Sequence, residues 1–187
     1  MSTATVHFYN PINSDTAGLF RNLCLNALIE SEQQPDNLMI MFSSSGGDIN
    51  PSFTMYQFLR TFPIPVTMCN VGAVESMACI IFLGADNRIA LPNTHFKLHG
   101  FTWTFGPAPV PYSGIFEAYT SLNSAVEQYA NIFEERTAGA THPVDNVRDY
   151  LRGKALILNH EEAVATGITT LDAKEIKFTF PGVHMFP

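Results

Sequence analysis

Ser76 is the residue of this chain best suited to act as a nucleophile. It follows Val66–Cys69, which is expected to form a short buried strand, and it precedes residues that are apolar at helical density. The serine is therefore expected at or near a helix N-terminus, where unpaired N–H groups and the helix dipole stabilise negative charge. The Met77 N–H could bind the charge that forms on a substrate carbonyl. Serine is also the commonest helix cap in this position, so a purely structural role is the alternative.

Two further segments hold residues that this chemistry would need. The loop Ser43–Asn50 follows an apolar, strand-like run and carries Gly46 and Gly47, where the backbone can approach another group closely. His99 ends the alternating segment Leu91–His99 and is a candidate general base. Peptide hydrolysis needs a nucleophile, a base and oxyanion donors within mutual reach, and these segments together could supply all of them.

The order of these segments resembles the Clp protease proteolytic subunit family. In that family the corresponding elements are a Ser-Pro-Gly-Gly loop, an Ala-Ser-Met-Gly helix start and a Leu-Pro-Asn strand that ends in histidine. The resemblance spans residues 6–170 without rearrangement. It implies Ser76 as nucleophile, His99 as general base, and the N–H groups of Gly47 and Met77 as the oxyanion hole. The substrates it implies are peptides or unfolded protein chains.

One catalytic position of the family pattern has no counterpart. The family has an aspartate that orients the histidine, and the matching residue here is Ala155, which has no acid. An imidazole without an orienting group is a poor base, so we expect a Ser76–His99 dyad with low but measurable peptidase activity. The nearest substitutes in the sequence are Asp145, Asp149, Asn159, Glu161 and Glu162. Three other positions also depart from the family: Ser45 replaces proline, Glu75 replaces alanine and Ala78 replaces glycine.

Two other functions fit the same residues. A crotonase-like acyl-CoA enzyme has a related fold and could use Glu75 as acid or base, while the missing aspartate suggests an inactive structural subunit that pairs with an active paralogue. His95 and His99 share a strand face with Lys97, but no cysteine or carboxylate stands at ligand spacing, so a zinc site is disfavoured. The glycine loop is not a dinucleotide fingerprint and no P-loop lysine follows it. We therefore expect no cofactor and no metal.

Composition limits the function classes further. The 187 residues are expected to form a single domain spanning residues 1–187. The sequence is 46% hydrophobic and only 14% charged, which predicts a well-filled core. A net charge of −7, with ten unclustered Lys and Arg residues, argues against binding to nucleic acid or to anionic membranes. Cys24, Cys69 and Cys79 are expected to be core residues in a reducing compartment. Neither a signal peptide nor a membrane span is recognisable, so we expect a cytoplasmic protein.

Strand-like and helix-like segments alternate through the first half of the chain. Strands are expected at residues 6–9, 38–42 and 66–69. Helices are expected at residues 19–28, capped by Asn13 or Ser14, and from Asn50-Pro51 to Leu59. This α/β order favours parallel strands with crossovers, and the sequence alone leaves flavodoxin-like and Rossmann sheets open. The resemblance implies the ClpP/crotonase-like fold, built from repeated β-β-α units with a projecting handle helix.

The handle segment is expected at about residues 100–140. The residues before Ser113 are rich in aromatics and prolines, and Ser113 could cap a helix with a seam of large residues from Ile115 to Phe133. A plain core helix would fit the same spacing. The resemblance implies a handle between two stacked rings, most simply heptamers, and the low charge content agrees with self-association. Only five residues precede Val6, so docking to an ATP-driven unfoldase is expected to be weak or absent.

Two short helices are expected near the end of the recognisable sequence. Val144, Val147 and Leu151 have helical spacing, and Asn159–Gly167 has a capping-box pattern in which Glu162 would be a cap and Gly167 a terminator. The residues from 169 to 187 are apolar but interrupted by proline, and the sequence assigns them no role.

Overall fold

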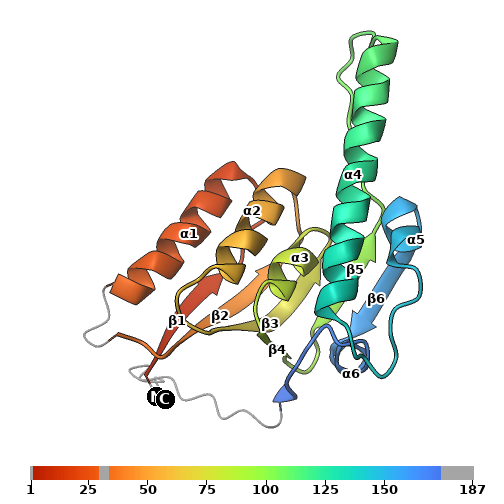
Figure 1. Cartoon of the computed structure of the whole chain (residues 1–187). Helices are drawn as coiled ribbons and strands as arrows, with labels where there is room; N and C mark the ends of the chain where they lie inside the picture. Colours follow the sequence, from red (N-terminus) through yellow and green to blue (C-terminus); the bar gives the residue numbers. More distant parts are fainter. Residues whose placement is uncertain (1, 30–33, 174–187) are drawn as a thin grey trace.

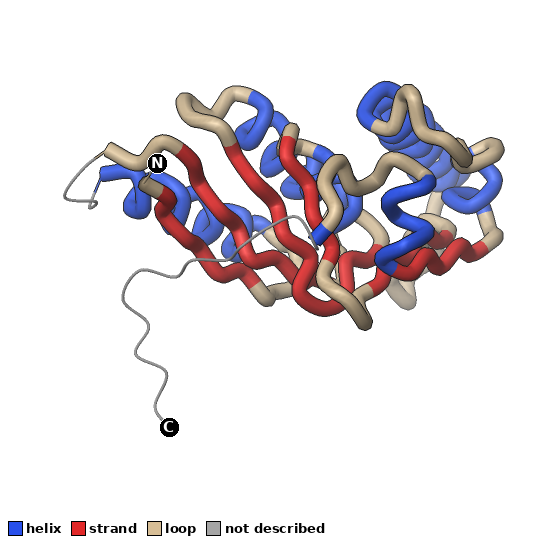
Figure 2. Tube along the Cα trace, turned by 90° about the horizontal axis from the view of Figure 1, so that it is seen from below, coloured by secondary structure: helices blue, strands red, loops and turns tan. Residues whose placement is uncertain are grey.

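One mixed sheet with helices packed on it makes up the part of the chain that the structure describes. The computed structural model describes residues 2–29 and 34–173. In these residues the sheet has six strands: β1 (Thr3–Phe8), β2 (Asn37–Ser44), β3 (Val66–Glu75), β4 (Asn87–Ala90), β5 (His95–His99) and β6 (Ala155–Asn159). The helices are α1 (Ser14–Ile29), α2 (Ile49–Arg60), α3 (Ala78–Leu83), α4 (Tyr112–Arg136), α5 (Val147–Arg152) and α6 (His160–Ala165). Helices α1, α2, α3 and the base of α4 lie on the same side of the sheet (Figure 1; Figure 2).

The strands follow the order β1-β2-β3-β5-β6, with β4 beside β3. The pairs β1–β2, β2–β3, β3–β4 and β3–β5 are parallel, which confirms the expected α/β architecture with crossovers. The last pair, β5–β6, is antiparallel. The carboxyl ends of β2, β3 and β5 therefore lie at the same edge of the sheet, and these are the strands that lead into the glycine loop, Ser76 and His99.

β3 is longer than predicted because it has two different neighbours on one side. Its first half pairs with β4, which the sequence analysis did not predict, and its last residues pair with β5. The buried Asn70 sits at the change of partner. Its Nδ2 donates to the His95 carbonyl oxygen at 3.0 Å, and its Oδ1 accepts from the Gly72 N–H at 3.0 Å. The strand expected at 66–69 thus continues to Glu75 and brings Ser76 level with the end of β5.

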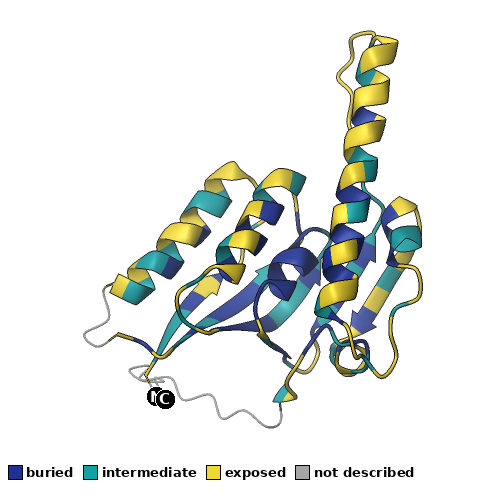
Figure 3. Cartoon of the chain, in the orientation of Figure 1, coloured by how far each residue is buried: buried dark blue, intermediate teal, exposed yellow. Residues whose placement is uncertain are grey.

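α3 is the centre of the hydrophobic core. All six residues from Ala78 to Leu83 are buried (Figure 3), as expected for a helix that is apolar on every side. The ring of Phe82 meets that of Phe96 on β5 edge to face, with centroids 5.0 Å apart. The three cysteines, Cys24, Cys69 and Cys79, are buried and free, and burial raises the pKa of each thiol to about 12. Their expected role as core residues is confirmed.

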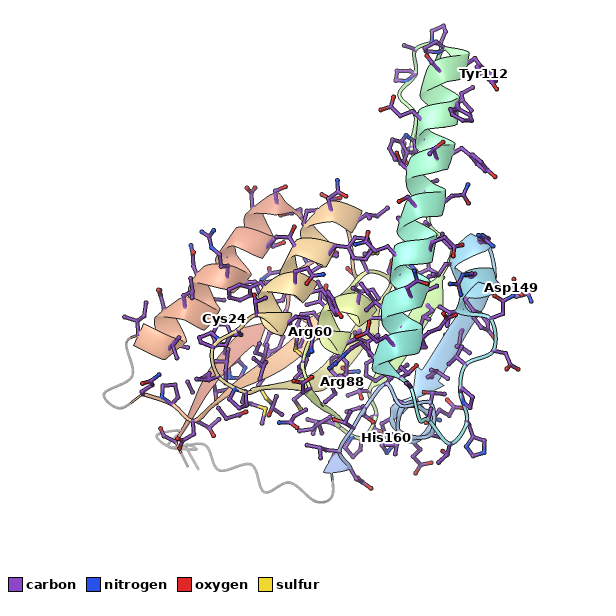
Figure 4. The ribbon with its side chains drawn as sticks, in the orientation of Figure 1. Cys24, Arg60, Arg88, Tyr112, Asp149 and His160 are labelled. Atoms are coloured by element: carbon purple, nitrogen blue, oxygen red, sulfur yellow. The ribbon has the colours of Figure 1, made fainter. Side chains whose placement is uncertain are left out.

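The long helix α4 is half core and half projection. Toward its C-terminus the residues Val126, Tyr129 and Phe133 are buried, whereas its N-terminal half stands away from the sheet (Figure 3; Figure 4). Large apolar side chains are exposed there: Tyr112 at the far end, Ile115, Phe116 and Tyr119. The projecting helix is confirmed, and the core-helix alternative holds only for its second half. The expected cap is wrong, because α4 begins at Tyr112 with Pro111 as N-cap, so that Ser113 lies inside it.

The side chain of Arg88, on β4, forms hydrogen bonds to residues near the end of the described chain. It is 2% exposed and donates to the carbonyl oxygens of Ile168 (2.7 Å), Ala85 (2.9 Å), Arg136 (2.9 Å) and Gly167 (3.1 Å). Burial, followed by the nearby positive charge of Arg136, lowers its pKa to about 10. The cost of burying this charge is offset by hydrogen bonds, because peptide carbonyls surround the guanidinium.

The predicted caps of α1 and α6 are correct. Asn13 accepts from the Thr16 N–H at 2.9 Å and caps α1, and Asn159 and Glu162 form the expected capping box of α6. Gly167 follows α6 with a φ of 72°, and α5 covers the short helix predicted around Val147. The predicted start of α2 at Asn50-Pro51 is wrong, since the helix begins at Ile49 after Asp48.

The strand β6 was not predicted. Most of the segment 169–187, to which the sequence assigned no role, lies outside the described residues. In the ranges that are described, no helix combines the length and the hydropathy that crossing a membrane requires.

Candidate active site

Ser76 lies in the turn between β3 and α3 with a left-handed backbone, φ 55°. This conformation is costly for a residue other than glycine, by about 1–3 kcal/mol, and persists where the surroundings impose it. The Ser76 N–H donates to the Lys97 carbonyl oxygen at 2.7 Å, and the Ser76 carbonyl oxygen accepts from the Cys79 N–H at 3.1 Å. A serine held in a tight strand–turn–helix is a known way to expose a nucleophilic hydroxyl.

The structure corrects the expected relation between Ser76 and the helix. α3 begins at Ala78, its N-cap is Met77, and no side chain caps it. The interpretation of Ser76 as a helix cap is therefore wrong. α3 is also only six residues long, so its dipole adds less at Ser76 than we expected. The relevant donor is instead the Met77 N–H itself, which lies in the turn.

The glycine loop is in direct contact with the serine turn. Gly46 has a φ of 84°, and a Cβ atom built on it would lie 2.7 Å from Ser76 Cβ and 2.6 Å from the Glu75 carbonyl oxygen. Gly47 is similarly close to Ile12, where a Cβ would come within 2.1 Å of the carbonyl oxygen. The loop is fixed in place by the bonds Ile12 N–H to Gly46 O (2.8 Å) and Asp48 N–H to Ile12 O (2.9 Å). Both glycines are required because no side chain fits.

The two N–H groups expected to form the oxyanion hole are free to bind an acceptor. In the described parts of the chain, neither the Gly47 N–H nor the Met77 N–H donates to a protein oxygen. Gly47 is exposed, so water can accept from its N–H, but Met77 is buried, and an unpaired N–H in a buried residue is uncommon and needs an explanation. The Met77 N atom lies close to the glycine loop, 3.1 Å from the point where a Cβ atom on Gly46 would be, so the two N–H groups belong to neighbouring segments.

His99 ends β5 beside the end of β3. Along β5 the residues His95, Lys97 and His99 are half-buried and alternate with the buried Phe96 and Leu98, which confirms the shared face. Since Glu75 is paired with Lys97 in the parallel register, Ser76 and His99 both lie at the carboxyl ends of adjacent strands. Over the residues that the structure describes, no hydrogen bond joins the Ser76 hydroxyl to the His99 ring, which is common in enzymes without substrate.

The contact partner of His99 defines its tautomer. Nδ1 lies 3.0 Å from the Gly100 carbonyl oxygen. A carbonyl oxygen can only accept, so Nδ1 carries the proton and Nε2 of the neutral ring has the free lone pair. This is the form that a general base needs. The sequence analysis missed this contact because a backbone carbonyl has no side-chain signature.

Ala155 lies directly opposite His99 in the antiparallel β5–β6 pair. Residues paired in this way carry their side chains on the same face of a sheet, with Cβ atoms about 5 Å apart. The position that we match to the family aspartate is thus opposite the imidazole, and it holds only a methyl group.

The proposed substitutes for that aspartate have other partners or show no contact with His99. Asn159 and Glu162 are engaged in the α6 capping box, and Asp149 forms an ion pair with Lys154 at 3.1 Å. Within the described ranges no hydrogen bond or ion pair joins Asp145 or Glu161 to the His99 ring. The Gly100 carbonyl is the group that the structure places on Nδ1.

Glu75 and His95 form a separate pair next to the site. His95 Nε2 lies 2.9 Å from Glu75 Oε1, with both side chains partly exposed. Glu75, which a crotonase-like reaction would use as acid or base, is therefore occupied by His95. Groups of three or more His, Cys, Asp or Glu residues arranged to hold a metal ion are not found among the described residues.

A cleft of about 710 Å³ borders the glycine loop. Gly47 and Asp48 form one wall, and Thr102 and Trp103 from the segment after β5 form another. The α4 residues that line it are Ser121, Ala125 and Gln128. Ser76 and His99 are not among the lining residues, so the cleft lies beside the two side chains rather than around them.

Comparison with known proteins agrees with this geometry. The sequence model of the Clp protease family, described as "Clp protease", matches residues 1–171. This chain belongs to the Clp protease family. It is 30% identical over 152 residues to the ATP-dependent Clp protease proteolytic subunit 2 of Pseudomonas aeruginosa, an alignment that covers 79% of this chain and 71% of that protein. The subunit 2 of Borreliella burgdorferi is 29% identical over 147 residues, covering 74% and 68%.

The fold is that of ClpP structures. ClpP1 from Listeria monocytogenes superposes with a TM-score of 0.68 at 24% identity, covering 89% of this chain and 88% of that one. A mutant of the same ClpP1 gives a TM-score of 0.69 at the same identity and coverage. The expected ClpP-like α/β fold is confirmed, and the Clp protease family is one of proteolytic subunits and serine peptidases. The comparisons give no support to the acyl-CoA alternative.

Replacement of Gly46 by alanine tests the contact between the loop and the serine turn. Because Gly46→Ala places a methyl group against Glu75 O and Ser76 Cβ at a positive φ, we expect the free energy of unfolding to fall by about 2–4 kcal/mol. The matched control is Gly18→Ala in α1, where no atom lies within 4 Å of the new Cβ and a gain of about 0.5–1 kcal/mol is expected. Urea unfolding of both variants measures the difference, and equal midpoints would contradict the close contact.

Proposed function

We propose that this chain is a serine endopeptidase of the Clp proteolytic-subunit type, with Ser76 as nucleophile and His99 as general base. The observation that carries the proposal is the left-handed Ser76 turn packed on the Gly46–Gly47 loop, with His99 on the neighbouring strand end. Conformational strain is typical of functional residues. Membership of the Clp protease family supports the same reaction.

The reaction follows from the placement of these groups. Nε2 of His99 takes the proton of the Ser76 hydroxyl while Oγ attacks the substrate carbonyl carbon. The carbonyl oxygen becomes an oxyanion that accepts from the N–H groups of Gly47 and Met77. The imidazolium then gives its proton to the leaving amine, which breaks the peptide bond and leaves an acyl group on Ser76. Water, deprotonated by His99, releases this group and restores the serine.

The Gly100 carbonyl takes the orienting role that an aspartate has in a complete triad. It fixes the tautomer of His99, but it is neutral and stabilises the imidazolium less than a carboxylate would. Losing the aspartate of a complete triad lowers turnover about ten-thousand-fold. The oxyanion hole and substrate binding still keep the rate above that of the uncatalysed reaction in water. We therefore expect slow hydrolysis of peptides and unfolded chains. The second candidate is an inactive subunit paired with an active paralogue, which Ala155 favours.

The exposed apolar residues of the handle support self-association. Trp103 and Phe105, in the segment before α4, are exposed, as are the four large apolar residues of the α4 projection, and exposed apolar side chains gathered in one segment are typical of protein–protein contacts. We propose rings, most simply heptamers, that stack through this segment. The curated relatives are named as subunits of an ATP-dependent protease. The expectation of weak docking to an unfoldase stays a prediction.

Fluorophosphonate labelling tests the nucleophile. We expect covalent modification of the wild-type protein at Ser76, and no labelling or peptide turnover after Ser76→Ala, because Oγ forms the bond to phosphorus. Ser113→Ala changes an exposed serine on α4 and should label normally. Mass spectrometry locates the adduct. Turnover that survives in Ser76→Ala would refute the nucleophile assignment, and a wild-type protein that neither labels nor turns over would establish the inactive subunit instead.

Restoring an acid opposite His99 tests the origin of the low activity. In Ala155→Asp the carboxylate would stand in register with the imidazole, and we expect kcat to rise about tenfold or more with little change in KM. The control is Ile157→Asp, which places the same charge on the same strand face opposite Lys97. Peptidase kinetics of both variants decide the matter. An equal rise in both would assign the effect to net charge rather than to His99.

A charge on the handle tests the assembly. Phe116, 58% exposed on α4, would lie within the ring-to-ring contact, so Phe116→Glu should halve the particle mass by separating the rings. Phe116→Leu keeps an apolar side chain and should leave the mass unchanged. Sedimentation velocity distinguishes the species. A wild-type protein that is monomeric at micromolar concentration would contradict both the rings and their stacking.

A further inference from the structure

Tyr129 places a polar group in the core directly behind the serine turn. It lies on the buried half of α4, 0% exposed, with its ring packed between Phe101 and Phe133 at centroid distances of 5.9 and 6.4 Å. A buried hydroxyl needs a hydrogen-bond partner. The Tyr129 O–H donates to the Ser76 carbonyl oxygen at 3.3 Å, and the Cys79 thiol is a second hydrogen-bond neighbour.

The hydroxyl remains a donor under all ordinary conditions. Burial, and then the neighbouring Cys79, raise the pKa of Tyr129 well above its usual value. Burial likewise raises the pKa of the Cys79 thiol to about 12, and that thiol donates to the Val74 carbonyl oxygen at 3.3 Å. Both groups therefore stay neutral and protonated, and the contact does not depend on an ionisation.

The carbonyl that Tyr129 holds belongs to the peptide unit that carries the Met77 N–H. A trans peptide is planar, and its C=O and N–H point in opposite directions. A donor that keeps the Ser76 oxygen turned toward the core therefore keeps the Met77 N–H turned toward the other side, where the oxyanion would form. The Cys79 N–H, at 3.1 Å from the same oxygen, acts in the same sense.

We propose that Tyr129 is a positioning residue for catalysis: its hydroxyl fixes the Ser76–Met77 peptide unit so that the Met77 N–H faces the oxyanion. The inference rests on the proposed function for its kinetic consequence. The orientation of the Ser76–Met77 peptide unit can be tested by experiment whether or not the chain is an active peptidase.

Tyr129→Phe removes the hydroxyl and retains the ring contacts. We expect kcat to fall about tenfold while KM changes less than about twofold, because the donor acts on the transition state rather than on the bound substrate. The affinity for a peptide boronate, whose tetrahedral adduct on Ser76 carries the negative charge, should fall by a similar factor. General destabilisation of the fold would not weaken the boronate selectively.

Tyr56→Phe is the matched control. Tyr56 is a buried tyrosine of α2, 5% exposed; burial raises the pKa of its hydroxyl, and the charges of Arg136 and Arg60 act in the opposite direction. Removing that hydroxyl measures the general cost of the same chemical change in the same core. We expect kcat, KM and boronate affinity to remain within about twofold of wild type.

Hydrogen–deuterium exchange separates this inference from the proposed function. The Ser76 and Cys79 amides are protected by bonds to Lys97 O and to Ser76 O, so a peptide unit that is released in Tyr129→Phe should exchange faster over residues 74–79. Tyr56→Phe should not show this change. Faster exchange with an inactive wild-type protein would remove the proposed function and keep the positioning role. Unchanged exchange, or unchanged kcat and boronate affinity in an active protein, would overturn the role of Tyr129.

Discussion

Ser76 occupies a backbone conformation that L-amino acids avoid, and it is kept there by hydrogen bonds from three separate elements. β5 accepts from its N–H through Lys97, while the Cys79 N–H of α3 and the Tyr129 hydroxyl of α4 both reach its carbonyl oxygen. None of these elements could reach the turn if β3 ended where its apolar run ends. The extra length of β3, and the buried Asn70 that joins it to β5, are therefore part of the site.

The proposed base, His99, has a neutral hydrogen-bond partner. The Gly100 carbonyl selects the tautomer of His99 without adding negative charge, and the position across the strand pair is filled by Ala155. The carboxylate closest to Ser76 in sequence, Glu75, is paired with His95 instead. In the mechanism that we propose, this arrangement would stabilise the imidazolium less than a carboxylate would, so a fold of the Clp type need not imply a fast reaction.

The sequence predicted the segments of the site better than their connections. The glycine loop, the apolar helix after Ser76, the alternation along β5 and the capping box at Asn159 are local patterns, and each is confirmed. β4 (NRIA) and β6 (ALILN) were missed because neither shows the apolar–polar alternation that identifies β5. Their pairing is decided by tertiary contacts.

Tertiary contacts also determine the features of the site that could not be predicted from the sequence. No property of Tyr129 distinguishes it in the sequence from the other large residues of its helical stripe, yet the fold turns its hydroxyl onto Ser76. The start of α3 was placed too early because a serine before an apolar run commonly caps a helix, whereas here the strand continues up to it. Ala155 could be located from the family pattern, but its pairing with His99 required the sheet register.

The hydrogen bonds of Arg88 have a consequence for how the chain folds as it is synthesised. Its guanidinium is buried against carbonyls of Gly167 and Ile168, about eighty residues further along the chain. Until those residues have left the ribosome, the buried charge lacks two of its four carbonyl acceptors, and burying it costs more free energy. We therefore expect β4 to settle against β3 late, after the residues that follow α6 have been synthesised.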